Sequence, residues 1–95
     1  MQAVRLYAQG DLRFEDVPGL QAPRPGWVRG KVTHAGICGS DIHNFRTGQW
    51  ISRSPSIGGH EFAGIVSEAG PETDGFQPGD QVAGEPLHGL HRRVV

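Results

Sequence analysis

The 15 glycines and 7 prolines of this chain constrain its fold more than any other feature. Glycine loses much backbone entropy in regular structure, and proline lacks the N–H that helices and ladders require. The two residue types are spread along the chain without a period or a low-complexity run. They therefore favour many short strands joined by tight turns over long helices. A length of 95 residues allows one small domain with a thin core.

Alternating apolar and polar residues predict a hairpin at the N-terminus. The alternation runs through residues 3–7, as in Val4 and Leu6, and again through residues 12–17. Gln9-Gly10-Asp11 supplies the turn between them. Residues 17–26 carry three prolines and are expected to form an extended, irregular connection.

Further strands are predicted from Trp27 to about residue 37, over residues 62–66, and from Gln81 onward. A short helix or turn is expected over residues 41–45. Its apolar residues Ile42 and Phe45 stand at positions i and i+3, which predicts that both face the core. Trp50 lies in the following loop and fits a pocket wall as well as ordinary packing. From residue 86 onward the sequence shows no strand or helix period.

Charge and hydropathy exclude several classes of protein. The formal net charge is -1 and no basic patch occurs, which argues against a nucleic-acid partner. No apolar run is long enough for a membrane span, and the first residues lack the pattern of a signal peptide. A single cysteine cannot form an internal disulfide. Disulfides therefore do not constrain the redox compartment, and a cytoplasmic location is the default expectation.

The residues that carry chemistry concentrate in segments 36–43 and 58–61. Cys38, His60 and Glu61 offer a thiolate, an imidazole and a carboxylate, the ligand types of a zinc site with three protein ligands and one open position. Asp41 is a candidate to orient His60 from behind through a hydrogen bond. Other side chains nearby can move protons.

A hydroxyl beside a metal site, followed by a titratable group, can carry a proton to water. Ser40 followed by His43 fits that pattern. The residues alone leave the alternatives open, however. Cys38 also fits a small buried apolar residue, and a spacing of 22 positions between Cys38 and His60 predicts nothing by itself. His43 also fits a histidine at a helix end, and Glu61 a salt-bridged surface glutamate.

The order of the motifs carries a family resemblance. The motifs are Gly36-Ile37-Cys38-Gly39-Ser40-Asp41-Ile42-His43, then Gly59-His60-Glu61 and Gly64, with Pro25-Gly26 before them and Pro78-Gly79-Asp80 after them. Together they resemble the N-terminal catalytic domain of the zinc-containing medium-chain alcohol dehydrogenases over residues 1–86. Gly39-Ser40-Asp41 and segment 82–86 resemble most closely the polyol, sorbitol, butanediol and threonine dehydrogenase branches.

The resemblance implies a mainly β fold, a partly open, GroES-like β-barrel that is incomplete here. It implies catalytic Zn²⁺ on Cys38 and His60, with Glu61 as a ligand or exchanging group. Ser40 and His43 match the proton-relay positions of the family, and Asp41 matches the carboxylate behind the zinc ligands. Full-length relatives of this kind are homo-oligomers that pass a hydride from a secondary alcohol or polyol to NAD or NADP.

Departures from the family pattern qualify these expectations. No second cysteine exists for the structural-zinc lobe that usually follows, and no Gly-x-Gly-x-x-Gly motif exists for a nucleotide-binding Rossmann domain. We therefore expect no cofactor-binding residue in this chain, and residues 87–95 are expected to be an off-pattern tail. The chain is predicted to be a truncated or frameshifted part of a dehydrogenase, inactive alone. The alternative is a non-enzymatic metal-binding or structural GroES-like barrel.

Overall fold

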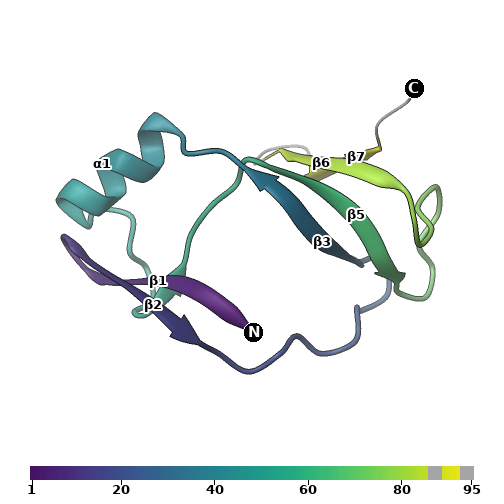
Figure 1. Ribbon diagram of the computed structural model, residues 1–95, viewed down its shortest axis with the longest axis horizontal. Coiled ribbons are helices and arrows are strands. Elements are labelled where there is room, and N and C mark those ends of the chain that lie inside the picture. Colours follow the sequence, from purple (N-terminus) through teal and green to yellow (C-terminus); the bar gives the residue numbers. More distant parts are fainter. Residues whose placement is uncertain (86–88, 93–95) are drawn as a thin grey trace. The chain divides into compact units, whose positions relative to one another are not determined.

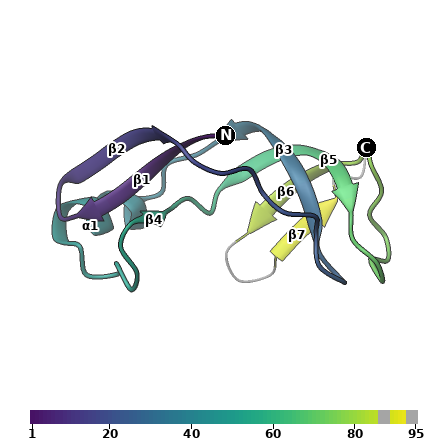
Figure 2. The same ribbon diagram turned by 90° about the horizontal axis from the view of Figure 1, so that it is seen from below.

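A computed structural model of the chain describes residues 1–85 and 89–92. Within these residues the fold is mainly β with one short helix (Figures 1 and 2). The elements in chain order are β1 (Gln2–Ala8), β2 (Asp11–Asp16), β3 (Val28–Ala35), α1 (Gly39–Thr47), β4 (Ser56–Ile57), β5 (Phe62–Ala69), β6 (Gln81–Glu85) and β7 (Gly89–Arg92).

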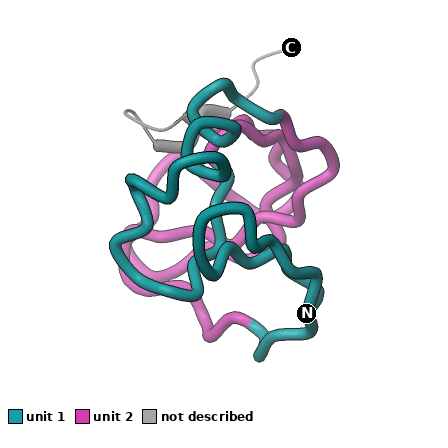
Figure 3. Tube along the Cα trace, turned by 90° about the vertical axis from the view of Figure 1, so that its left-hand side faces the viewer, with its two compact units in different colours: residues 1–19, 37–59 teal, residues 20–36, 60–95 magenta. Residues whose placement is uncertain are grey.

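The chain divides into two compact units, each built from two separate stretches (Figure 3). Unit 1 consists of residues 1–19 and 37–59, and unit 2 of residues 20–36 and 60–95. The chain therefore passes from one unit to the other three times. None of the helices within the described residues is long and apolar enough to cross a membrane.

Unit 1 contains a three-stranded sheet in the order β2-β1-β4 and the helix α1. The predicted hairpin is confirmed, because β1 and β2 pair antiparallel with Leu6 opposite Leu12. Gly10 turns the chain with a φ of 70°, a conformation that glycine adopts without steric cost. Its N–H donates to the carbonyl oxygen of Phe45 over 2.8 Å, which ties the hairpin turn to α1.

Unit 2 contains an antiparallel sheet in the order β3-β5-β6-β7. Figure 1 shows β3 and β5 side by side, and their pairing extends from Val28 opposite Ala69 to Ala35 opposite Phe62. The core of this unit includes Val66 and Val82, which are buried on adjacent strands.

Two glycines of this sheet are required by close approach. A Cβ on Gly64 would overlap the carbonyl oxygen of Lys31 on β3, and a Cβ on Gly84 would overlap the ring of Phe62 on β5. Phe62 and Gly84 are opposite each other in the β5–β6 ladder, so the aromatic ring covers the position without a side chain. The β3–β5 contact is therefore closer at Gly64 than any other residue type would allow.

Three features differ from the sequence prediction. Ile42 and Phe45 were expected to face the core, but they are 46% and 39% exposed and α1 buries no residue. The short strand β4 was not predicted, because two residues carry no readable alternation. Strand β7 lies in the segment where no period was found, and the remainder of the predicted tail, at residues 87–88 and 93–95, lies outside the described residues.

The close approach at Gly64 generates a stability prediction. Gly64→Ala should lower the free energy of unfolding by about 1–3 kcal/mol, because the new methyl group forces the β3 backbone away. Gly30→Ala is the matched control on the facing strand, since its Cβ would lie 3.8 Å from the Ile65 carbonyl oxygen, an ordinary contact. The control should stay within about 0.5 kcal/mol of wild type. Urea unfolding of the three proteins measures both values, and equal losses would contradict the packing argument.

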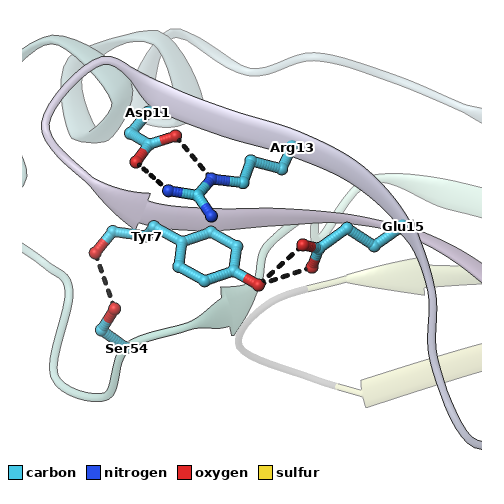
Figure 4. Close-up of polar contacts among 5 residues, drawn as sticks. All are labelled: Tyr7, Asp11, Arg13, Glu15 and Ser54. Atoms are coloured by element: carbon cyan, nitrogen blue, oxygen red, sulfur yellow. Dashed lines mark hydrogen bonds and ion pairs between the residues drawn. The ribbon is translucent and has the colours of Figure 1, made fainter.

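One face of the β1–β2 hairpin carries a polar cluster (Figure 4). The Tyr7 hydroxyl lies 2.8 and 2.7 Å from the two carboxylate oxygens of Glu15 and donates its proton to that group. The Arg13 guanidinium lies 4.0 Å from the centre of the Tyr7 ring, and it donates two hydrogen bonds to Asp11 over 3.0 and 2.9 Å. The Tyr7 carbonyl oxygen accepts from Ser54, which joins the hairpin to the segment before β4.

These contacts shift two titrations in opposite directions. The hydrogen bond to the Glu15 carboxylate raises the pKa of Tyr7, and the hydrogen bonds from Arg13 lower the pKa of Asp11. The protonated phenol is thus favoured in the folded state. Its contribution to stability is present below the pKa of the unfolded tyrosine and is lost as the pH rises through the folded pKa.

Tyr7 is the only tyrosine in the chain, so its titration can be read directly from phenolate absorbance. We expect a midpoint above the ordinary value of 10.0, which Glu15→Gln should move back toward that value. Asp16→Asn removes a carboxylate from the same strand outside the cluster and should leave the midpoint unchanged. If the midpoint of the Tyr7 titration is the same in wild type and Glu15→Gln, the hydrogen bond between Tyr7 and Glu15 is absent in solution.

Candidate metal centre and proton path

Cys38 is the residue that starts α1. It occupies the N-cap position with an extended backbone (φ -86°, ψ 156°), and its carbonyl oxygen accepts from the N–H of Asp41 over 3.0 Å. The Asp41 carboxylate in turn accepts from the Cys38 N–H over 2.9 Å. This reciprocal pair satisfies backbone groups that a helix start leaves unpaired, and it fixes the backbone that carries the thiol.

Asp41 was expected to orient His60. In the structure, its Oδ2 takes part in the capping bond to Cys38, and the side chain is half-buried in the first turn of α1. Its role toward His60 stays a prediction.

Ser40 and His43 lie one turn apart on α1, at positions i and i+3 that share one side of a helix. Ser40 is half-buried, and His43 is exposed. The His43 Nε2 lies 2.7 Å from the Oε1 of Gln49, and its ring centre lies 4.7 Å from that of Trp50. Trp50 thus contacts a predicted site residue while remaining 58% exposed. Gln49 was missed from the sequence, because no motif marks it.

His60 and Glu61 belong to unit 2, directly before β5. His60 is half-buried and Glu61 exposed. The Glu61 carbonyl oxygen accepts from the Gly36 N–H over 2.8 Å, which extends the β3–β5 ladder by one step. The Glu61 side chain lies over Gly36, since a Cβ there would come within 2.8 Å of Oε2 and 3.3 Å of the Glu61 Cβ. Gly36 therefore leaves the space that the Glu61 carboxylate occupies.

Chain connectivity tethers Cys38 and His60 to this same end of the β3–β5 pair. Cys38 follows Gly36 by two residues, and His60 precedes Glu61 by one. With consecutive Cα atoms about 3.8 Å apart, the Cα of Cys38 stays within about 7.6 Å of that of Gly36. The structure thus brings Glu61 against Gly36 within unit 2, and groups Cys38 with Ser40, Asp41 and His43 on α1 within unit 1.

Comparison with known proteins identifies the fold family. Residues 24–93 match the family described as the alcohol dehydrogenase GroES-like domain. This match covers more than half of the chain. The chain belongs to that family. The resemblance drawn from the cysteine and histidine motifs is thereby confirmed, as is the expectation of a mainly β fold with sheets that do not close.

Individual members of the alcohol dehydrogenase family agree with this assignment. Sorbitol dehydrogenase of Bos taurus is 40% identical over 84 residues, which cover 85% of this chain and 23% of the relative. The crystal structure of 2R,3R-butanediol dehydrogenase from Bacillus subtilis superposes with a TM-score of 0.81 at 34% identity, over 90% of this chain and 27% of that one. A zinc-dependent alcohol dehydrogenase 2 from Streptococcus pneumonia gives a TM-score of 0.78 at 31% identity, over 87% of this chain and 24% of that one. The chain thus spans about a quarter of the length of these dehydrogenases.

The capping bond of Asp41 generates a prediction that does not depend on metal. In a chelator-containing buffer, Asp41→Ala should lower the free energy of unfolding by about 1 kcal/mol, because the Cys38 N–H loses its acceptor. Asp41→Asn keeps an acceptor oxygen and should lose less. Asp74→Ala, in an exposed loop of unit 2, serves as the control and should stay near wild type. The capping role is wrong if thermal unfolding gives the same loss for Asp41→Ala and Asp74→Ala.

Proposed function

We propose that this chain forms the zinc-binding part of a dehydrogenase that oxidises a secondary alcohol or polyol with NAD or NADP, and that it is inactive alone. The observation that carries the proposal is the position of the Glu61 carboxylate, which lies over Gly36 at the end of the β3–β5 pair. Cys38 and His60 are close to these two residues in the chain. Membership of the alcohol dehydrogenase family and similarity to a zinc-dependent relative support it.

The donor set fits a catalytic zinc ion. A thiolate at Cys38, an imidazole nitrogen at His60 and a carboxylate oxygen at Glu61 would leave one position for substrate. Zinc bound there would act as a Lewis acid on an alcohol oxygen and favour loss of its proton. Backbone placement also fits, because the Asp41 cap holds Cys38 at the start of α1, and the bond to Gly36 holds Glu61.

The helix supplies a route for the released proton. Ser40 can accept a proton at Oγ while passing its own hydroxyl proton to His43 one turn away. His43 is exposed and can release the proton to water. Asp41 is proposed to assist His60, in addition to its bond to Cys38. The hydride acceptor, NAD or NADP, is proposed to be bound by parts of the enzyme other than this chain.

Cobalt(II) provides a direct test of the proposed ligands, because a bound thiolate gives it an intense charge-transfer absorption in the near ultraviolet. We expect the chain to develop this absorption as Co²⁺ is titrated in, with the weak affinity of an incomplete site, and to lose it when Zn²⁺ is added. Cys38→Ser should abolish the absorption. His60→Ala should weaken Zn²⁺ binding at least tenfold, measured by competition with a chromophoric chelator. His34→Ala removes an exposed histidine of β3 and should leave binding unchanged.

The two glycines beside Cys38 offer a matched pair for Glu61. Gly36→Ala displaces the Glu61 carboxylate and should weaken Zn²⁺ binding, whereas a Cβ at Gly39 meets no atom within 4 Å, so Gly39→Ala should not. Undiminished Zn²⁺ binding by Cys38→Ser and His60→Ala would refute the site. Equal effects of Gly36→Ala and Gly39→Ala would remove Glu61 from it.

A further inference from the structure

The segment after α1 folds back onto the helix through two side chains. The Thr47 hydroxyl donates to the carbonyl oxygen of His43 over 2.8 Å and accepts from the N–H of Gln49 over 3.2 Å. The Asn44 Oδ1 accepts from the N–H of Trp50 over 2.9 Å. The backbone N–H groups of Gln49 and Trp50, which follow the C-cap residue Gly48, are thus held by side chains of the last helical turn.

The helix end makes this reversal possible. Gly48 takes the left-handed conformation with a φ of 68°, and its N–H donates to the carbonyl oxygen of Asn44 over 2.8 Å. A glycine in this position ends a helix and turns the chain at no steric cost. Residues 49 and 50 therefore return along α1.

Two side chains reach His43 as a result. The Gln49 Oε1 lies 2.7 Å from its Nε2, and the Trp50 ring is tilted by 41° against the imidazole with ring centres 4.7 Å apart. All the groups involved lie within unit 1. An exposed histidine would otherwise rotate about its side-chain bonds, and these two contacts fix one orientation.

The hydrogen bond also selects a tautomer. An amide oxygen is only an acceptor, so the His43 Nε2 must carry the hydrogen that it donates to Gln49. In the neutral ring, Nδ1 then keeps the lone pair. Nδ1 is the one ring atom that can accept a proton while the bond to Gln49 persists.

We propose that Gln49 is a positioning residue of the proton path, which holds His43 as the Nε2–H tautomer and thereby makes Nδ1 the proton acceptor. In the proposed path, Nδ1 takes up the proton that leaves the Ser40 hydroxyl as this hydroxyl accepts one from the alcohol, and the imidazolium returns to neutral by releasing a proton to water. Trp50 restricts the rotation of the ring. The transfer of a proton from the alcohol to His43 rests on the proposed function, whereas the tautomer of His43 is independent of it.

Long-range ¹H–¹⁵N correlation spectra of the zinc-free chain test the tautomer at about pH 8.5, above the ordinary histidine titration. His43→Asn assigns the His43 signals among the 5 histidines. We expect wild-type His43 to carry its proton on Nε2. Gln49→Ala should shift the ratio of tautomers about fivefold toward Nδ1–H, as loss of one ordinary hydrogen bond implies.

Two further variants distinguish positioning from general disturbance of the loop. Gln49→Glu keeps an acceptor oxygen and should preserve the Nε2–H tautomer. Gln9→Ala removes a glutamine that bonds the Arg46 carbonyl oxygen in the same unit, and it should leave the His43 signals unchanged. A wild-type His43 protonated on Nδ1, or a ratio that changes less than twofold in Gln49→Ala, overturns the proposal. So does an equal change in Gln9→Ala.

Failure of this proposal is separable from failure of the proposed function, because no metal is present in the measurement. Loss of the tautomer preference in Gln49→Ala, together with undiminished Zn²⁺ binding by Cys38→Ser, would retain the positioning role and refute the zinc site. An unchanged tautomer ratio in Gln49→Ala, together with loss of Zn²⁺ binding in Cys38→Ser, would refute the positioning role and retain the zinc site.

Discussion

The antiparallel pairing of β3 with β5 supports most of what unit 2 contributes to the candidate site. It requires glycine at position 64, where the Lys31 carbonyl oxygen occupies the space of a side chain. It ends at the bond between Gly36 and Glu61, and it is continued on the far side of β5 by β6. A strand paired on both sides resists local opening more than an edge strand does, and β5, which follows Glu61 directly, is paired with both β3 and β6.

The helix side of the site is held by different means. No residue of α1 is fully buried, and Ile42 and Phe45 keep 46% and 39% of their surface exposed, so apolar packing covers the helix only in part. Its ends are defined by hydrogen bonds instead, at Cys38 and Asp41 in the first turn and at Gly48 after the last. The bond from Gly10 to Phe45 attaches its last turn to the hairpin turn. Local bonds of this kind hold the helix that carries Ser40 and His43, the residues of the proposed proton path, independently of the candidate ligands in unit 2.

Sequence reasoning predicted the parts of the fold whose signals are local. The alternation in residues 3–7 and 12–17 with a glycine between them predicts β1 and β2, and the short helix or turn expected over residues 41–45 lies within α1. Strand β4 was not predicted, because it is defined by two bridges to β1, which lies some 50 positions earlier in the chain. The burial of Ile42 and Phe45 was predicted wrongly, since a helical spacing indicates a shared face without indicating what covers it.

The candidate site was predictable to the same degree. The residues of the proposed zinc trio and of the proposed relay can be read from the sequence, and the order of the motifs indicated the alcohol dehydrogenase family. The contact of Gln49 with His43 could not be predicted from the sequence. It depends on hydrogen bonds from the loop backbone to the side chains of Thr47 and Asn44, which hold the loop against the helix. Side-chain bonds to the backbone across a helix end leave only a weak pattern in the sequence.

The interleaving of the two units has a consequence for how such a fold can be inherited. Unit 1 needs residues on both sides of segment 20–36, and unit 2 needs residues on both sides of segment 37–59. No single continuous piece of the gene encodes either unit. A single crossover between residues 19 and 60 in recombining genes therefore separates the two stretches of at least one unit, so the candidate ligand residues and the proposed proton path stay with their own units only when both units are inherited together.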